Sequence, residues 1–552
     1  MVSSVATRVP RRLWTSTVAA AVLASSLLVT GVSATSVPGP PNGDTVGPVE
    51  VSGAVHSDVS APLSSLVGVA PPASTDTQTH ERPLRVLPNM GNALNQADGA
   101  LQTSSGPLVP TTSLFPPFAG IGDTSNTPAN HCNCAPPDTN GAVGATQYVQ
   151  WVNTAFAVYD KATGAIAAGF PTPGNTLWAG FGGGCETNNS GYPIVQYDKA
   201  ANRWIFTQFS VSTTPYLQCI AVSQTSDATG AYNRYAYSFG TQFPDYPKLG
   251  VWPDGYYMSF NIFSNGSTWA GAKVCAFDRT KMLVLGDTTA TMQCFPLSTS
   301  YSSLLPSDLD GATAPPTGSP DYFMNFGKNS LNLWKFHADF TTPSNAKLTG
   351  PTNIPVASFS PACGGGTCIP QPQTGQRLDS LGDRLMYRLA YRNFGNYGSL
   401  VVTHSVTGSG TAAPRWYELR SSPVGTFNYM INQQSSYAPD ATYRWMGSAA
   451  QDKLGDLAIG YSASSSTISP QIRYTGRVAA VDQLGQLRAE STVALPSTGS
   501  NTGPYSRWGD YSSMVTDPLD DCTFWYTNEY LKQDGGSFTW STHIVSFKFS
   551  SC

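Results

Sequence analysis

Three aspartates have the side-chain chemistry that could cleave a glycosidic bond: Asp138, Asp245 and Asp510. One carboxylic acid can protonate a leaving oxygen while a second carboxylate acts as base or nucleophile. Each of the three stands just before a segment that reads as β-strands. They are therefore our candidate catalytic residues. The structural alternative is that each acid ends a strand, caps a turn or pairs with a neighbouring arginine.

Three arginines repeat at similar positions along the chain. Arg377, Arg444 and Arg507 are each followed by Leu or Trp and then by a short path to Ser, at spacings of 67 (444 − 377) and 63 (507 − 444) residues. Guanidinium groups gathered near one axis would repel one another unless acids such as Asp379 or an anionic ligand neutralised them. We predict that these arginines, with Tyr511, bind substrate. Salt bridges between neighbouring units are the alternative.

The segments that must position these residues read as repeated antiparallel strands. Residues 191–229 show the pattern. Bulky and polar side chains alternate over residues 203–209, apolar side chains gather over residues 217–223, and a polar turn separates the two ranges. Similar units recur at intervals of about 50 to 70 residues, which is typical of propeller blades with long loops. The sequence predicts an all-β fold and a β-propeller over residues 114–552, with seven blades as the expected count and six or eight as alternatives.

Composition supports short strands and argues against several functional classes. Charged residues make up 12% of the chain, while Gly (52) and Pro (42) are abundant. The formal charge of −4 lacks the basic excess of a nucleic-acid binder. The sequence has no His-Glu-x-x-His zinc motif, phosphate loop or dinucleotide fingerprint, and its Gly/Ser-rich run at 408–410 lacks the context of a nucleophile elbow. We predict no cofactor and no nucleic-acid partner.

The N-terminal region is typical of an exported protein. Basic residues precede a short apolar run, and small residues up to Ala34 offer a cleavage site. We predict a signal peptide over residues 1–34 and a mostly disordered leader rich in Pro, Ser and Thr over residues 35–113. The mature protein is expected to be secreted, monomeric and without a membrane span.

Ten cysteines all follow the leader, and an even number in an exported chain indicates disulfides. Pairing neighbours within one unit is the simplest arrangement. It gives Cys185–Cys219, Cys275–Cys294, Cys363–Cys368 and Cys522–Cys552. Cys132 and Cys134 remain, in a His-Cys-Asn-Cys run that could be mistaken for a metal site. We predict no metal and no free thiol.

Three motifs resemble those of a family of secreted bacterial β-propeller-like proteins without assigned activity. They are residues 136–144 (PPDTNGAVG), 246–257 (YPKLGVWPDGYY) and 507–512 (RWGDYS). The resemblance covers most of residues 114–552. More remotely, the unit pattern is similar to sialidase-type and other glycan-active propellers, although the sialidase Asp-box is not present. Such propellers use an arginine cluster for a carboxylate, so this resemblance implies an acidic sugar.

Two functions remain open at this stage. The first is an enzyme, of the glycoside hydrolase or polysaccharide-active kind, that acts on an extracellular glycan at the central-channel face. The second is a non-catalytic adhesin, lectin or surface scaffold. Trp252, Tyr256, Trp416 and Trp445 could stack on sugar faces, but such residues also form blade cores. Two carboxylates facing one pocket would favour the enzyme, and binding without turnover would favour the lectin.

Overall fold

A computed structural model describes residues 47–68, 80–81, 87, 95–122, 132, 134–493, 495, 497–536 and 539–552. All of these belong to one structural unit, which begins at Asp44. The predicted signal peptide lies outside the described residues. Within the described part of the chain, no helix is long and apolar enough to cross a membrane.

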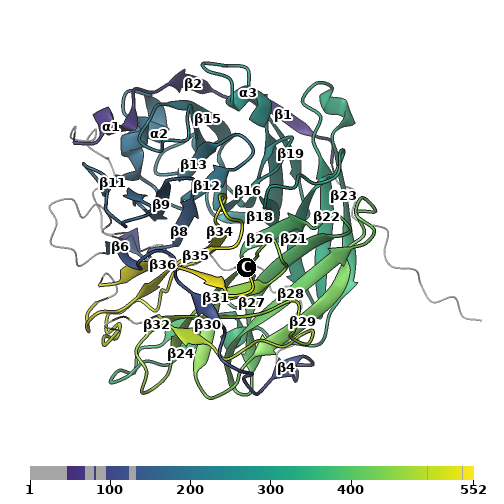
Figure 1. The fold of residues 1–552 in the computed structure, drawn as a ribbon. Helices are drawn as coiled ribbons and strands as arrows, with labels where there is room; N and C mark the ends of the chain where they lie inside the picture. The colour runs from purple at the N-terminus through teal and green to yellow at the C-terminus, as the bar shows by residue number, and fades with distance from the viewer. Residues whose placement is uncertain are drawn as a thin grey trace, which may run out of the picture. The chain divides into compact units, whose positions relative to one another are not determined.

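Seven antiparallel meanders account for most of the described strands (Figure 1). The first three are β8 (Thr139–Val143), β9 (Gln147–Val152), β10 (Ala155–Asp160) and β11 (Thr172–Pro173); β12 (Ile194–Asp198), β13 (Arg203–Ser210), β14 (Tyr216–Ser223) and β15 (Tyr232–Gly240); and β16 (Gln242–Val251), β17 (Tyr256–Ser264), β18 (Thr268–Phe277) and β19 (Thr291–Pro296). The next two are β20 (Leu305–Asp310), β21 (Asp321–Gly327), β22 (Ser330–His337) and β23 (Lys347–Pro355); and β26 (Leu385–Asn393), β27 (Gly398–Gly408), β28 (Thr411–Ser421) and β29 (Met430–Tyr437). The last two are β30 (Tyr443–Gln451), β31 (Leu457–Ser464), β32 (Gln471–Arg477) and β33 (Ser491–Thr492); and β34 (Ser513–Thr516), β35 (Phe524–Tyr530) and β36 (Ser541–Phe549).

Short elements complete the described chain. The remaining strands are β1 (Glu50–Gly53), β2 (His56–Val59), β3 (His80–Glu81), β4 (Leu101–Gln102), β5 (Thr111–Thr112), β6 (Phe118–Gly122), β7 (Cys134–Ala135), β24 (Thr367–Ile369) and β25 (Leu378–Asp379). The helices are α1 (Leu63–Leu66), α2 (Gly183–Thr187), α3 (Arg279–Met282), η1 (Gly174–Trp178), η2 (Pro343–Asn345) and η3 (Ala362–Gly365). The all-β prediction is confirmed.

The first strand of each meander, its inner strand, contacts the inner strand of the next. The contacts run β8, β12, β16, β20, β26, β30, β34 and back to β8. Side chains hold neighbouring inner strands together: the Val195 N–H donates to Asn140 Oδ1 (2.7 Å), and the Ser513 hydroxyl donates to the Gly141 carbonyl (2.9 Å). The inner strands therefore form a closed cycle, which is the connectivity of a β-propeller.

Large aromatic side chains fill the space between the meanders. Trp252, Tyr256, Trp416 and Trp445 are all almost completely buried. Burial of this kind is what packing one sheet face against the next requires. These four residues form core, as the alternative interpretation of the sequence held.

Parts of the predicted leader are ordered, which corrects the expectation of disorder for those parts. β1 pairs with β19, β2 with β15, and β4 with β29. β5 also pairs with β36. The same strand pairs with β6, which lies after the predicted boundary at residue 114. An outermost strand offers unpaired N–H and C=O groups that a short extended segment satisfies without an apolar pattern of its own.

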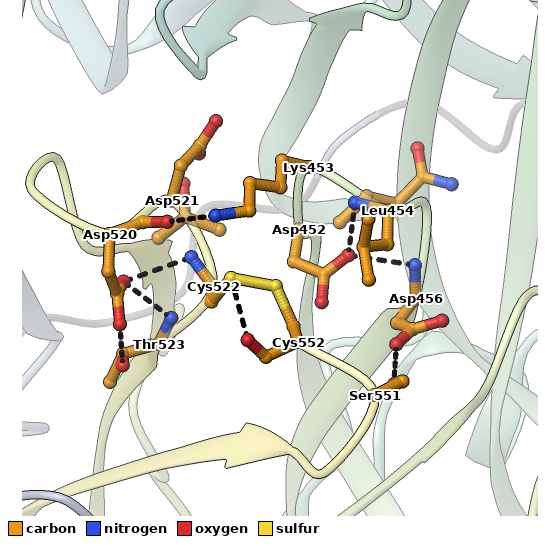
Figure 2. Close-up of a disulfide and its surroundings, with 12 residues drawn as sticks. Asp452, Lys453, Leu454, Asp456, Asp520, Asp521, Cys522, Thr523, Ser551 and Cys552 are labelled. Carbon is orange, nitrogen blue, oxygen red and sulfur yellow. Dashed lines mark hydrogen bonds between the residues drawn. A yellow bond between two sulfur atoms is a disulfide. The ribbon is translucent and has the colours of Figure 1, made fainter.

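The predicted cysteine pairs are confirmed. The structure contains Cys185–Cys219, Cys275–Cys294, Cys363–Cys368 and Cys522–Cys552, and it also joins Cys132 to Cys134. Among the described residues there is no free cysteine. The Cys522–Cys552 bridge fastens the end of β36 to the turn before β35, and Ser551 beside it donates to Asp456 (Figure 2).

Candidate functional site

The chain enters several inner strands through a residue in the left-handed conformation. Asp138 and Tyr192 precede β8 and β12 with φ of 48°, and Tyr246 adopts φ of 53° at a bulge in β16. Non-glycine residues rarely adopt positive φ, and such strain concentrates at sites where a side chain must be aimed. Here these turns direct polar side chains toward one another at the N-terminal ends of the inner strands.

Five residues from four segments form what we call the central polar cluster: Asp138, Tyr192, Lys248, Arg507 and Asp510. The Asp510 N–H donates to Asp138 Oδ1 (2.8 Å), and the Tyr192 hydroxyl donates to Asp510 Oδ2 (2.7 Å). Arg507 Nη2 lies 2.5 Å from Asp510 Oδ1. Asp138 and Asp510 are both fully buried. The structure thus brings together two of the three predicted catalytic acids.

The surroundings displace the pKa values of Asp138 and Asp510 in opposite directions. Burial raises the pKa of Asp138, and the charge of Asp510 raises it further. Burial also acts to raise the pKa of Asp510, but the positive charges of Arg507 and Arg384 outweigh it, so the pKa of Asp510 is lowered. The cluster therefore favours a protonated Asp138 beside an ionised Asp510.

Lys248 adds a buried cation to the same place. Its ammonium lies 3.5 Å from the centre of the Tyr246 ring and 4.3 Å from the centre of the Tyr511 ring. Burial lowers the pKa of Lys248. Tyr511, predicted to bind substrate, is itself buried and donates its hydroxyl to the Pro193 carbonyl (2.8 Å). The aromatic rings thus shield the cation from water.

Further acids surround the cluster. Asp245 lies in β16, the strand that carries Lys248. Burial raises the pKa of Tyr192 most, and the charges of Asp510, Asp245 and Asp138 raise it further. Asp379 Oδ2 lies 3.6 Å from Arg507 Nη1. Burial raises the pKa of Glu529, which accepts a hydrogen bond from the Gly509 N–H.

The three predicted arginines make different contacts. Arg507 belongs to the central polar cluster. Arg444 is buried in β30, where its guanidinium binds Asp440 and Glu490 at 2.9 and 2.8 Å. Arg377 precedes β25 and is exposed. The adjacent tryptophans do meet, since the ring centroids of Trp445 and Trp508 lie 5.6 Å apart.

Sequence reasoning missed Tyr192, Lys248, Arg384 and Glu529. Two of them carried a usable signal: Lys248 interrupts the otherwise uncharged run 246–252, and Glu529 lies in the aromatic strand β35. Lysine and glutamate are almost never fully buried without a partner. A charged residue inside a strand that is otherwise read as core therefore indicates a buried polar site.

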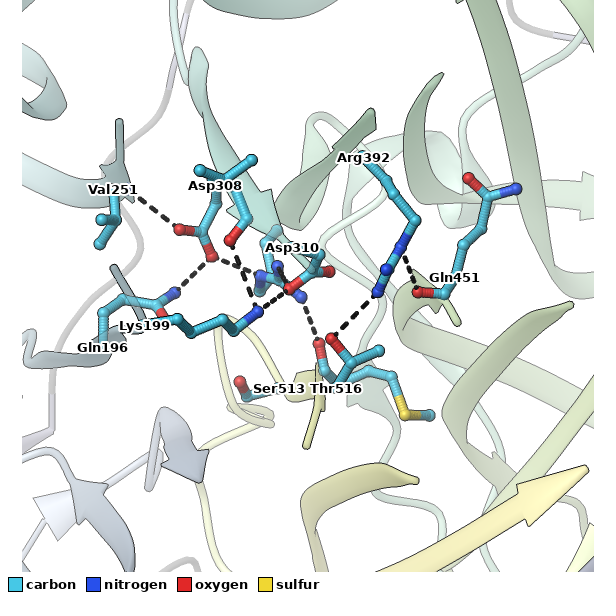
Figure 3. A network of polar contacts seen from close by, with 12 residues as sticks. Gln196, Lys199, Val251, Asp308, Asp310, Arg392, Gln451, Ser513 and Thr516 are labelled. Carbon is cyan, nitrogen blue, oxygen red and sulfur yellow. Dashed lines mark hydrogen bonds and ion pairs between the residues drawn. The ribbon is translucent and has the colours of Figure 1, made fainter. Parts of the chain in front are cut away.

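A second polar network joins side chains and backbone of the inner strands β12, β16, β20 and β26 (Figure 3). Asp308 accepts from the Val251 N–H (3.0 Å), from Gln196 Nε2 (2.8 Å) and from Arg388 Nε (2.6 Å). Arg388 also reaches Asp310, which lies 2.7 Å from it. None of the five residues of the central polar cluster takes part in these contacts.

No family model and no curated protein matches the sequence. Among solved structures, the chain is similar to a Trypanosoma rangeli sialidase in complex with the inhibitor DANA, at 12% identity and a TM-score of 0.29, over 65% of this chain and 54% of that one. It is similar to a GH43 endo-arabinanase from Bacillus licheniformis (13% identity, TM-score 0.24, 52% and 93% covered) and to a PL25 ulvan lyase (12%, 0.25, 76% and 81%). The chain thus spans about half the length of the sialidase, and these scores are too low to assign an activity.

Proposed function

We propose that this protein is a secreted, seven-bladed β-propeller that hydrolyses an extracellular glycan at its central polar cluster. The observation that supports hydrolysis is the direct contact of Asp138 and Asp510, 2.8 Å from Asp510 N to Asp138 Oδ1, in surroundings that raise the pKa of the first carboxyl group and lower that of the second. Glycosidic hydrolysis needs one carboxyl group that holds its proton and one that does not. The closed cycle of seven inner strands supports the blade count, and five disulfides fit an exported chain.

Each residue of the cluster has a role in this proposal. Asp138 donates the proton to the leaving oxygen, and Asp510 acts as base or nucleophile. Asp245 and Arg507 keep 9% and 7% of their surface exposed, whereas Asp138 and Asp510 have none, so a substrate meets the former pair first. Because Nε and Nη1 of Arg507 make no hydrogen bond to the described residues, this guanidinium would favour a glycan that carries a carboxylate or sulfate.

The test is hydrolysis of a panel of neutral, uronate-bearing and sulfated polysaccharides, measured as release of reducing ends. Asp138→Asn and Asp510→Asn should each lower the rate about 10²- to 10⁴-fold. Asp58→Asn is the matched control, because Asp58 pairs with Arg234 at the outer strand β2, far along the sheet from the inner strands. Full activity in either cluster variant, or no release from any polysaccharide by the unaltered protein, would refute the proposal.

A second candidate function is a non-catalytic lectin or adhesin. The observation that favours it is the complete burial of Asp138 and Asp510, each already hydrogen bonded within the protein. In that case an exposed residue must contact the ligand, and Arg377 is the predicted one. A glycan array should then show binding without turnover, and Arg377→Ala should abolish binding of acidic glycans while the melting temperature stays unchanged.

A further inference from the structure

A pocket of about 290 Å³ opens at the opposite, C-terminal ends of the inner strands. It is lined by residues at the ends of five inner strands or just after them, among them Ala145, Tyr197, Trp252, Leu309 and Leu519. We call it the strand-end pocket. Its volume is near the lower limit for small-molecule sites, which suits a ligand of about one sugar ring.

The strand-end pocket is separate from the central polar cluster. No residue of the cluster lines the pocket, and the network of Asp308, Asp310 and Arg388 lies on the inner strands β20 and β26 (Figure 3). All three side chains are buried and paired with one another. Because breaking such a buried network is costly, a ligand in the pocket does not reach Asp138 or Asp510.

The charges around the pocket cancel in fixed pairs. Arg279 binds Asp198 through two hydrogen bonds of 2.6 and 3.0 Å. Asp521 is held in the same forked manner by Arg392, at 2.7 and 2.8 Å. Lys199 Nζ lies 2.7 Å from Asp310. The lining therefore presents no uncompensated charge, and an ionic ligand would have to compete with a pair that is already formed.

Apart from Asn202 and the Tyr197 hydroxyl, which lies 3.4 Å from Asn202 Oδ1, the rest of the lining is apolar. Trp252, Pro253 and Leu309 contribute one part of the wall, and Pro518 and Leu519 another, with 69% of Leu519 exposed. An apolar wall bordered by fixed donors and acceptors matches a ring that has a hydrocarbon face and hydroxyl groups at its edge. We propose that the strand-end pocket is a second binding site, and that it takes an uncharged sugar unit.

The pocket can be blocked without disturbing the core. Ala312 lines it and is exposed, so Ala312→Trp should fill it and leave the melting temperature unchanged. Ala168→Trp, at an exposed turn before β11, is the matched control. Binding is measured by calorimetry and by saturation-transfer NMR with methyl glycosides of neutral hexoses and pentoses, and with the methyl glycoside of glucuronic acid as the anionic probe.

At least one neutral probe should bind the unaltered protein and the Ala168→Trp variant, and should bind Ala312→Trp about tenfold more weakly or not at all. The glucuronide should bind at least about tenfold more weakly than its neutral counterpart. Asp138→Asn and Asp510→Asn should leave this binding unchanged even where they abolish hydrolysis, which separates the two sites. The inference is overturned by absence of binding of every neutral probe, by undiminished binding to Ala312→Trp, by equal affinity for the glucuronide, or by loss of binding in the Asp138 and Asp510 variants.

Discussion

The ion pair between Lys161 and Asp517 joins the first meander to the last, so it tests whether closure of the cycle stabilises the fold. Lys161 follows β10, Asp517 follows β34, and the Lys161 ammonium lies 2.7 Å from Asp517 Oδ2. The ammonium also donates to the carbonyls of Gly144 and Ala145 at 3.2 Å. Only 5% and 3% of the two side chains are exposed.

Lys161→Met removes the charge and keeps most of the side-chain length. It leaves Asp517 buried, with Trp525 Nε1 at 3.0 Å as a remaining donor. Breaking a buried pair by removing one partner costs about 3–5 kcal/mol, because the other charge stays uncompensated. The double variant Lys161→Met/Asp517→Asn removes that charge as well, so it should be more stable than Lys161→Met alone.

Urea denaturation followed by tryptophan fluorescence measures these differences in the free energy of unfolding. Lys453→Met is the control, since Lys453 is exposed and its ammonium donates to the Asp520 carbonyl at the surface. This control should cost less than about 1 kcal/mol. If Lys161→Met costs no more than the control, or if the double variant is less stable than Lys161→Met, the buried pair does not hold the first and last meanders together.

Three further predictions follow from single features. Replacing Cys522 and Cys552 together by Ala should lower the free energy of unfolding by about 3.6 kcal/mol, as the loss of a crosslink over 30 residues implies, and an unchanged thermal midpoint would contradict this. Gly250→Ala should destabilise by about 1–3 kcal/mol, because the added Cβ would lie 2.1 Å from the Ser307 carbonyl oxygen, and calorimetry checks this. Burial raises the pKa of Asp452 from 3.8 to about 7 in the folded protein, so the folded state binds this proton more tightly than the unfolded chain does. The free energy of unfolding should therefore fall as pH rises from about 4 to about 7. Asp452→Asn should flatten that part of a profile of urea midpoint against pH.

Much of the fold could be predicted because the strands are encoded locally. Residues 203–209 alternate bulky and polar side chains, and they form β13. β1 could not be predicted in this way. Its four residues, Glu50–Gly53, are all exposed and carry no apolar pattern. These residues are ordered because their backbone pairs with the outer edge of β19. No residue within the segment indicates that such an edge is available.

The candidate site could be predicted in part. Asp138 and Asp510 each precede an inner strand, so placing them near one axis followed from the repeat alone. The same repeat aligned Arg444 with Arg507, but Arg444 lies within β30 and Arg507 lies in the loop before β34. The two side chains therefore start from different positions relative to their strands, and they bind different acids. Such differences depend on loop geometry, which the spacing of residues in the sequence does not record.

The pairing of β6 with β36 has a consequence for the order of events during synthesis. Thr542 donates to the Ile121 carbonyl across a sequence separation of 421 residues. At a translation rate of about 5–20 residues per second, β6 waits roughly 20–80 s for its partner strand to be made. Until then its edge is unpaired, and the last meander is incomplete. The final sheet thus becomes available only when β36 has been made, so a chain that stops before β36 has no route to the closed cycle.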